Sequence, residues 1–149
     1  YVATVARTYR KAIDDYMESE EKYRANMEYY KNEIAKCTYR QFTTGFYFGK
    51  TDSDSQIYDS NTYVKNYTYI GTVREVTPDG CVCFEQKNKF LVGEKLEAMG
   101  FDGTNIECEV QAIYDEEGNS MDSAPHPKQK LRVKLDKELK TGIILRRKE

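Results

Sequence analysis

The sequence predicts a mainly β protein, a small antiparallel β-barrel that follows an N-terminal arm of two helices. Three observations predict this fold. Apolar residues recur at every third or fourth position over residues 2–36, which is the period of a helix. From residue 63 onwards the period becomes two, as in strands with one buried face, and Gly, Asp and Asn separate the alternating segments. We therefore divide the 149 residues into a helical arm at 1–40, a connector at 41–62 and a β-barrel at 63–149.

The arm is expected to form two helices, at 3–17 and 20–36, with a bend near Ser19. Ser19 is a suitable N-cap, and the glutamates that follow it suit the positive first turn of a helix. The apolar stripes of the two helices are Val2, Val5, Tyr9, Ile13 and Tyr16, then Tyr23, Met27, Tyr30 and Ile34. Because tyrosine joins an apolar ring to a hydroxyl that reaches water, these stripes suit a surface that packs against another body.

The connector begins with "FTTGFYFGKTDSDSQIYDSNTY" at 42–63, in which three aromatics stand between two glycines. We expect these five residues to form a domain-packing motif, in which the rings anchor the connector to a neighbouring part and the glycines allow tight turns. The motif consists of Gly45, Phe46, Tyr47, Phe48 and Gly49. The polar residues after it would form a solvated loop that leads to the first strand.

Five to seven short strands are expected in the barrel. Their segments read "YVKNYTYIGTVREV", "CVCFEQ", "FLVGEKLEAMG", "IECEVQAIYD", "KLRVKLD" and "GIILRR". In the fourth segment, Ile106, Cys108, Val110 and Ala112 are expected to share one face, opposite Glu107, Glu109 and Gln111. In "KLRVKLD" the apolar residues would point inward and the three cations outward. A domain of about 85 residues can just bury a core of its own.

The composition, 39% apolar and 32% charged, is typical of a soluble globular protein. No apolar run approaches the ~18–20 residues that a membrane helix needs, and no signal for secretion is present. We therefore expect a cytoplasmic protein without membrane contact. The helical period already runs at Tyr1, where neither Met nor a capping residue stands. For that reason we expect the chain to be a piece of a longer protein.

Residues that could carry catalysis or bind a metal are sparse. Cys81 and Cys83 lack the spacing of a zinc site, and no second Cys or His pair accompanies them. With Cys37 and Cys108 they are expected to be reduced, half-buried small residues. His126, the single histidine, stands between two prolines, and the sequence places no Ser, Cys or carboxylate beside it. We assign this chain no catalytic residue, no metal and no cofactor.

Positive charge is concentrated at the C-terminal end. Residues 126–149 hold nine Lys and Arg against three Asp and Glu, whereas residues 1–125 hold fourteen against twenty-two. The candidate RNA-binding residues are Lys128, Lys130, Arg132, Lys134, Arg146 and Arg147. On an extended segment the alternate cations lie roughly 7 Å apart and can neutralise phosphates without reading sequence. Tyr67, Tyr69 and Phe84 would add base stacking if they are exposed. The alternative is a solvated strand face.

The segment "TTGFYFGK" resembles the peptidase U32 family, the collagenase-like proteases, just upstream of their C-terminal domain. The similarity continues through "YVKNYTYIGTV", "EQKNKFLVGEKLEAM" and "APHPKQKLRVKL" to "ILRRKE", and so covers nearly the whole chain. The resemblance implies that the β-part is similar to the small barrel found as the second domain of translation elongation factors. The family's catalytic signature, a Glu and Gly-rich segment with two closely spaced cysteines, has no counterpart here, because Cys81 and Cys83 differ in spacing.

Three functions stay open. In the first, which the family's peptidase activity favours, the chain is a non-catalytic accessory domain that holds a protein substrate. In the second, it is the RNA-holding domain of a relative that hydroxylates a base of tRNA or ribosomal RNA, as the resemblance also implies. In the third, it is purely structural and packs against the N-terminal catalytic domain, which is absent from this sequence, or against a second subunit. The oligomeric state stays open.

Overall fold

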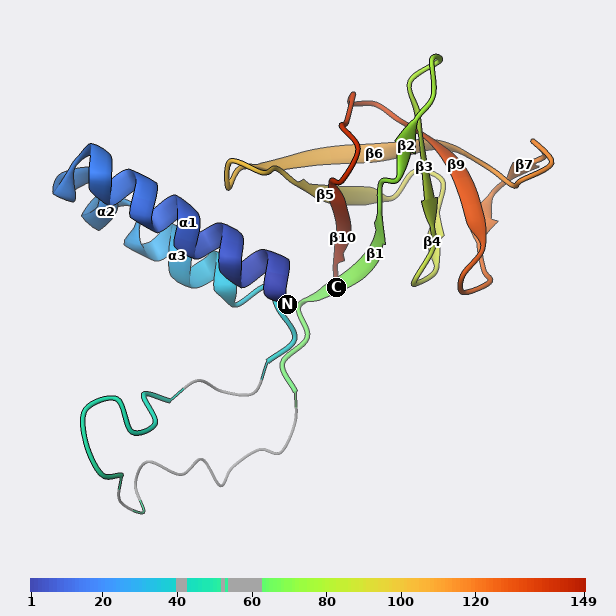
Figure 1. The fold of residues 1–149 in the computed structure, drawn as a ribbon. Coiled ribbons are helices and arrows are strands. Elements are labelled where there is room, and N and C mark those ends of the chain that lie inside the picture. Colours follow the sequence, from blue (N-terminus) through green and yellow to red (C-terminus); the bar gives the residue numbers. More distant parts are fainter. Residues whose placement is uncertain (40–42, 52, 54–62) are drawn as a thin grey trace. The chain divides into compact units, whose positions relative to one another are not determined.

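The computed structural model of the chain describes residues 1–39, 43–51, 53 and 63–149. The chain divides into two compact units, Tyr1–Asn66 and Tyr67–Glu149 (Figure 1). The helices belong to the first unit and the named strands to the second. Most of the connector predicted at 41–62 lies outside the described residues. No helix within the described ranges is long and apolar enough to cross a membrane.

The first unit is built from three helices. They are α1 (Val2–Glu18), α2 (Glu20–Ala25) and α3 (Met27–Ile34). The break predicted at Ser19 is confirmed, and the Ser19 hydroxyl accepts a 3.1 Å hydrogen bond from the Lys22 N–H as an N-cap. The helix expected at 20–36 is not continuous, because the backbone leaves the helical region at Asn26 (φ −92°, ψ 6°). The Asn26 side chain donates instead to the Asp15 carboxylate at 3.1 Å.

Asp15 is a buried carboxylate that links α1 to α3. The Tyr30 hydroxyl donates to it at 2.6 Å, and the ammonium groups of Lys11 and Lys22 lie 3.2 and 3.4 Å from it. Burial by itself would raise the pKa of Asp15, but the hydrogen bonds from Tyr30, Lys11 and Asn26 outweigh burial and hold that pKa at about 2. Burial, together with the Asp15 carboxylate, raises the pKa of Tyr30 to about 12.

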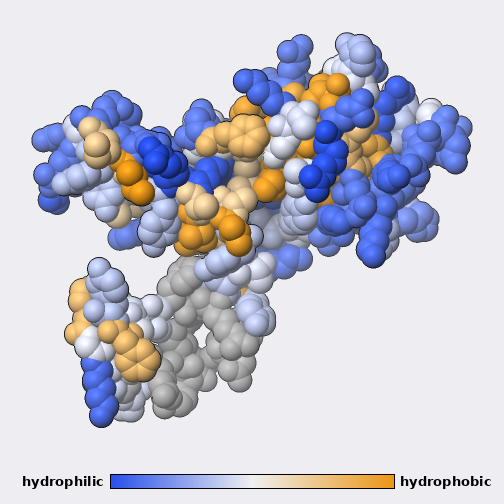
Figure 2. Space-filling model, viewed as in Figure 1, coloured by the Kyte–Doolittle hydropathy of each residue, from blue (hydrophilic) through white to orange (hydrophobic). Residues whose placement is uncertain are grey.

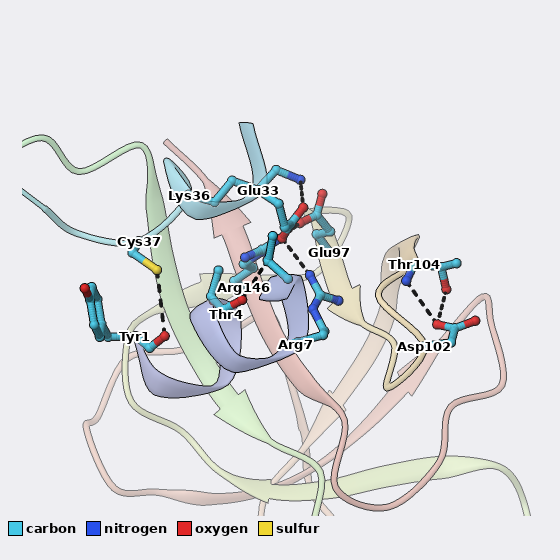
Figure 3. A network of polar contacts seen from close by, with 11 residues as sticks. Tyr1, Thr4, Arg7, Glu33, Lys36, Cys37, Glu97, Asp102, Thr104 and Arg146 are labelled. Carbon is cyan, nitrogen blue, oxygen red and sulfur yellow. Dashed lines mark hydrogen bonds and ion pairs between the residues drawn. The ribbon is translucent and has the colours of Figure 1, made fainter. Parts of the chain in front are cut away.

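Glu33 makes a second polar link inside the arm. The Arg7 guanidinium lies 2.6 Å from the Glu33 carboxylate and the Lys36 ammonium 3.1 Å from it (Figure 3). The rings of Tyr23 and Tyr30 stack with centroids 5.8 Å apart. The three helices therefore meet through ion pairs, hydrogen bonds and tyrosine rings rather than through an aliphatic core.

Apolar side chains of α1 remain at the surface of the arm. Tyr9, Ile13 and Tyr16 are 61, 52 and 55% exposed, and Figure 2 shows apolar side chains in orange among the hydrophilic ones on the helices. With Tyr23 they line a shallow groove of about 370 Å³. Contiguous apolar surface of this kind often marks a contact site. The part of the expected apolar stripe formed by Tyr9, Ile13 and Tyr16 is thus exposed on the surface of α1.

The second unit is an assembly of short antiparallel strands. They are β1 (Tyr67–Thr72), β2 (Glu75–Val76), β3 (Cys81–Glu85), β4 (Phe90–Leu91), β5 (Lys95–Met99), β6 (Asn105–Tyr114), β7 (Ser120–Met121), β8 (Ser123–Ala124), β9 (Lys130–Leu135) and β10 (Ile144–Lys148). Eight form one sheet in the order β1-β10-β5-β6-β9-β3-β2, with β7 paired to β6, and β4 pairs with β8. The mainly antiparallel β prediction is confirmed. The hydrogen-bonded order begins at β1 and ends at β2, and no ladder between the described strands closes it into a barrel.

The core of this unit consists of the inward-facing aliphatic and aromatic side chains of the sheet. Its fully buried members include Ile70, Phe90, Leu96, Val110, Ile113, Val133 and Leu145. A tight turn over residues 77–80 joins β2 to β3: Gly80 has φ +77° and its N–H donates to the Thr77 carbonyl at 2.8 Å. The first strand begins at Tyr67, and Val64 makes only an isolated bridge to Tyr39.

A β-bulge in β6 decides which of its residues reach the core. The register of β6 on β9 shifts between Val110 and Ala112. Because a bulge inserts one extra residue, the alternation reverses beyond it, and Ile113 is fully buried in place of Ala112. The expected shared face therefore holds for Cys108 and Val110, whereas the expectation for Ala112 is wrong. Ile106, near the start of the strand, is 38% exposed.

Candidate nucleic-acid interface

The strand β9 carries a row of three cations on its outer face. β9 lies between β6 and β3 in the sheet, and its Leu131 and Val133 are buried in the core. Alternation then turns Lys130, Arg132 and Lys134 to the opposite face, at spacings of roughly 7 Å. The structure thus brings together three of the six cations that the sequence singled out, in the arrangement expected of them. We call these three residues the basic row.

Neighbouring groups position each cation of the basic row. The Lys130 ammonium lies 3.5 Å from the Glu116 carboxylate, and the Arg132 guanidinium lies 4.9 Å above the Tyr114 ring. The Lys134 ammonium donates to a backbone carbonyl in the β2–β3 turn at 2.7 Å. The Lys130–Glu116 pair is 72 and 63% exposed, so water screens it and a competing phosphate displaces it at little cost.

The other three predicted cations lie outside β9, since Lys128 precedes it and Arg146 and Arg147 belong to β10. Lys128 is exposed in the turn before β9 and has φ +66°. The Arg146 side chain is 5% exposed and forms an ion pair with Glu97 at 2.5 Å. Arg147 lies 3.2 Å from the Glu94 carboxylate. Because a buried guanidinium must break its ion pair to reach a phosphate, we leave Arg146 out of the candidate surface.

A cleft of about 410 Å³ opens beside the basic row. Tyr69 and Thr72 of β1 line it, with Arg74 just before β2, Glu75 of β2, Glu85 of β3 and Lys130 of β9. It lies where β1 and β3 approach each other without being ladder neighbours. Its volume is within the range of small-ligand sites in proteins. Sequence reasoning missed this cleft, because its walls come from four strands that only the tertiary fold brings together.

The three aromatics considered for base stacking have different environments. Tyr69 is 42% exposed and lines the cleft, whereas Phe84 is only 2% exposed and belongs to the core. The Tyr67 ring lies beneath the Arg146 guanidinium, 5.0 Å from it. Of these three residues, Tyr69 therefore meets the condition of exposure that stacking requires.

The glycine-aromatic motif forms an exposed turn. Gly45 and Gly49 have φ +51° and +132°, which supports the expected use of glycine for tight turns. Phe46, Tyr47 and Phe48 are 77, 85 and 81% exposed, and the Tyr47 and Phe48 rings meet edge to face at 5.0 Å. The anchoring of these rings against a neighbouring part stays a prediction.

Burial sets the protonation state of three of the four thiols. All four cysteines are free. Burial raises the pKa of Cys81 and Cys83, and raises that of Cys108 to about 12, so these thiols are protonated at neutral pH. His126 is exposed before β9, where its carbonyl accepts from the Gln129 N–H at 3.3 Å. Among the described residues, no group of three His, Cys, Asp or Glu could hold a metal ion.

Two family models match this chain. The model of the peptidase family U32 C-terminal domain matches residues 65–146, and the model of peptidase family U32 matches residues 1–57. Two solved structures are similar, both of the C-terminal domain of a Geobacillus thermoleovorans protein assigned to the U32 peptidases, one as its selenomethionine variant. They share 30 and 32% identity with this chain, cover 54% of it and 99 and 91% of their own chains, and have TM-scores of 0.49 and 0.48.

Two curated relatives align along almost the whole chain. The tRNA hydroxylation protein P1 of Bacillus subtilis (strain 168) is 32% identical over 148 residues, which cover 99% of this chain and 35% of the relative. The tRNA hydroxylation protein P of Escherichia coli (strain K12) is 29% identical over 149 residues, which cover 98 and 32%. The chain thus spans about a third of the length of these relatives. From the two family models, the chain belongs to peptidase family U32, and its β-unit is the C-terminal domain of that family.

Proposed function

We propose that this chain holds RNA for a U32 protein that hydroxylates a base of tRNA. The observation that carries the proposal is the basic row, in which Lys130, Arg132 and Lys134 share the outer face of β9 beside a cleft. Phosphate contacts of this kind fix the position of an RNA without reading its sequence. Support also comes from the two relatives that are named tRNA hydroxylation proteins.

The attraction for RNA would come from the basic row and not from the net charge of the whole β-unit. Over residues 67–149 acidic residues slightly outnumber Lys and Arg, so the unit as a whole does not attract a polyanion. The three cations of the basic row would each replace a counterion on a phosphate. Between 50 and 200 mM salt, three such contacts should cost about 20- to 40-fold in affinity. A steep salt dependence of this size is the first sign to look for.

The experiment is a titration of the chain with bulk tRNA at these two salt concentrations. The test variant carries Lys130→Glu, Arg132→Glu and Lys134→Glu. The matched control carries Lys95→Glu, Lys137→Glu and Lys140→Glu, which makes the same change in net charge at three exposed lysines outside the row. The proposal expects the test variant to lose most of the affinity and the salt dependence, and the control to keep both.

Equal losses in the two variants would show that only net charge matters, and the basic row would lose its role. Unchanged tRNA binding by the test variant in the full-length protein would remove the RNA-holding proposal altogether. Binding of wild-type chain that is insensitive to salt would also contradict it, because phosphate contacts release counterions.

A second candidate is the function that the family's name suggests, holding a protein substrate for a peptidase. The exposed rings of Phe46, Tyr47 and Phe48 favour it, because exposed aromatic clusters commonly contact proteins. A parallel titration with denatured collagen tests it. Saturable binding to collagen that is lost when the three rings are changed to Ser, together with no tRNA binding, would favour this candidate.

The apolar face of α1 would pack against the N-terminal catalytic part of the longer protein. Tyr9, Ile13 and Tyr16 supply this face. In the full-length protein, changing the three residues to Ser should loosen the arm, which limited proteolysis would detect as faster cleavage near the arm. Cleavage at the wild-type rate would contradict this packing.

We also propose that the β-unit has the fold of the small barrel found as the second domain of translation elongation factors. This fold requires β1 to pair with β3, so that the sheet closes into a barrel around the core. An experimental structure of the unit tests it directly, since a ladder of backbone hydrogen bonds between β1 and β3 would be visible there.

A further inference from the structure

Tyr69 stands at the edge of the 410 Å³ cleft, next to a bulge in β1. The register of β1 on β10 shifts between Tyr69 and Gly71. Ile70, inside the bulge, is fully buried, whereas the Tyr69 next to it is 42% exposed. Bulges redirect side chains and are frequent beside binding sites. Strand alternation turns the Tyr69 ring outward between the buried Thr68 and Ile70, and the bulge that follows it also buries Gly71.

Several contacts fix the Tyr69 ring and its backbone. The Tyr69 hydroxyl lies 2.9 Å from the Thr72 hydroxyl, and the Tyr69 carbonyl accepts from the Asn88 side-chain amide at 2.7 Å. Gly71 lets β1 pass closely over the core, because a Cβ there would lie 2.4 Å from Cδ2 of Phe84. A ring that is already fixed loses little conformational freedom when a ligand stacks on it.

The charges of the cleft are mixed. Arg74, Lys87 and Lys130 line it together with Glu75 and Glu85. The Lys87 ammonium contacts the Glu85 carboxylate, and this hydrogen bond lowers the pKa of that carboxyl. Lys87 is thus held close by Glu85, whereas Lys130 lies 3.5 Å from the Glu116 carboxylate in an exposed pair that a phosphate displaces at little cost. Arg74 and Lys130 are therefore the cations best placed to bind an anion. The Glu75 carboxylate would oppose it.

We propose that this cleft binds one unstacked nucleotide of an RNA, with its base against the Tyr69 ring and its phosphate contacted by Arg74 and Lys130. The inference rests on the proposed RNA-holding function and deepens it, because it specifies which feature of the RNA is recognised. A base inside a duplex offers no free face to an aromatic ring, whereas a single-stranded or splayed base does. The basic row would then hold the neighbouring phosphates.

The test uses the whole chain and two probes, a short single-stranded oligouridylate and a duplex RNA of the same length. Tyr69→Leu should weaken binding of the single strand by about 5- to 150-fold, the usual loss for one stacked base. Tyr69→Phe keeps the ring and should retain most of the affinity. Tyr9→Leu, at an exposed tyrosine of α1, is the matched control and should bind as wild type does.

Two charge variants at the cleft are expected to change the affinity for the single strand in opposite directions. Arg74→Gln should weaken binding of the single strand and Glu75→Gln should strengthen it, each on the order of threefold to tenfold. A purely structural effect on the unit would lower affinity in both. Amide chemical shifts recorded by NMR during the titration should change over residues 69–75, 83–87 and 130–132 rather than elsewhere.

The outcomes separate this inference from the proposed function. Salt-dependent tRNA binding that Tyr69→Leu leaves unchanged would overturn the nucleotide cleft and leave the RNA-holding function in place. Absence of binding to tRNA and to the oligouridylate would overturn both. Duplex binding as tight as single-strand binding would also overturn the inference. A Tyr69-dependent affinity for denatured collagen without RNA binding would assign the cleft to a peptide instead.

Discussion

The Tyr30 hydroxyl of α3 donates a 2.6 Å hydrogen bond to the buried Asp15 carboxylate of α1. The ammonium groups of Lys11 and Lys22 lie 3.2 and 3.4 Å from that carboxylate, so its charge is compensated inside the arm. A slip of α3 along α1 would take the Tyr30 hydroxyl and the Asn26 amide away from the buried carboxylate, and losing partners of a buried charge costs more than the net gain from making the bonds. We infer that Asp15 fixes the register of α1 against α3.

The first prediction concerns Asp15 itself. Asp15→Ala should lower the free energy of unfolding of the arm by about 1–3 kcal/mol, because Tyr30 and Asn26 lose a buried acceptor. The matched control is Asp14→Ala, which removes an exposed ion pair with Arg10 and should change stability by less than about 0.5 kcal/mol. Urea unfolding followed by circular dichroism at 222 nm measures both. Equal effects of the two substitutions would contradict the role of Asp15.

The second prediction is the pH dependence of the arm. The pKa of Asp15, about 2, lies below its unfolded value near 4, so its stabilisation is present above about pH 4 and disappears as the pH falls towards 2. The pKa of Tyr30, about 12, lies above its unfolded value near 10, so its contribution is present below about pH 10 and disappears as the pH rises through 12. Helix stability should therefore be greatest between these limits.

The measurement is a series of urea unfolding curves across this pH range. Asp15→Ala should flatten the acid side of the profile, and Tyr30→Phe should flatten the alkaline side. A wild-type arm that becomes more stable as the pH falls from 4 to 2 would contradict this assignment.

The third prediction concerns the crossing of β1 over Phe84. Gly71→Ala should destabilise the β-unit by about 1–3 kcal/mol, because the added Cβ would lie 2.4 Å from the Phe84 ring. Combining it with Phe84→Leu should recover part of this loss, since the smaller side chain can move aside. Denaturant unfolding of the two single variants and the double variant gives the coupling. Strictly additive changes in the free energy of unfolding would show that the contact between residue 71 and Phe84 does not cause the destabilisation.

The fourth prediction concerns the reactivity of the thiols. In the folded chain at pH 8, iodoacetamide should label Cys83 first, since it is only half-buried, and Cys108 last, since burial raises its pKa to about 12. In denaturant all the thiols should react at similar rates. Mass spectrometry of tryptic peptides follows the labelling. Faster labelling of Cys108 than of Cys83 in the folded state would contradict the burial described above.

The fifth prediction compares two isoleucines. Ile13 of α1 is 52% exposed, whereas Ile113 of β6 is fully buried. Ile13→Ala should change the free energy of unfolding by less than about 0.5 kcal/mol, while Ile113→Ala should cost about 2–5 kcal/mol. Thermal or urea unfolding of the two variants measures both changes in the free energy of unfolding. A large loss at Ile13 in this chain would mean that the apolar face of α1 is already covered.

Local signals in the sequence determined where elements begin and which way they face. A serine hydroxyl followed by two glutamates was sufficient to place the break and N-cap at Ser19. The alternation in β9 was sufficient to turn Lys130, Arg132 and Lys134 outward, because the buried Val133 and its neighbours leave one orientation open. These features depend on residues that are neighbours in the chain, and the family resemblance followed from equally local motifs.

The tertiary structure alone decided the features that depend on distant partners. Ile113 replaced Ala112 in the core because β6 shifts its register on β9, a choice made by the pairing and not by the segment. Arg146 reads as one more cation at a basic C-terminus, yet Glu97, far away in sequence, draws it into an ion pair. The cleft beside Tyr69 exists only where β1, β2, β3 and β9 meet. Sequence periodicity reports burial within one element, whereas register, ion pairs and clefts are settled by packing between elements.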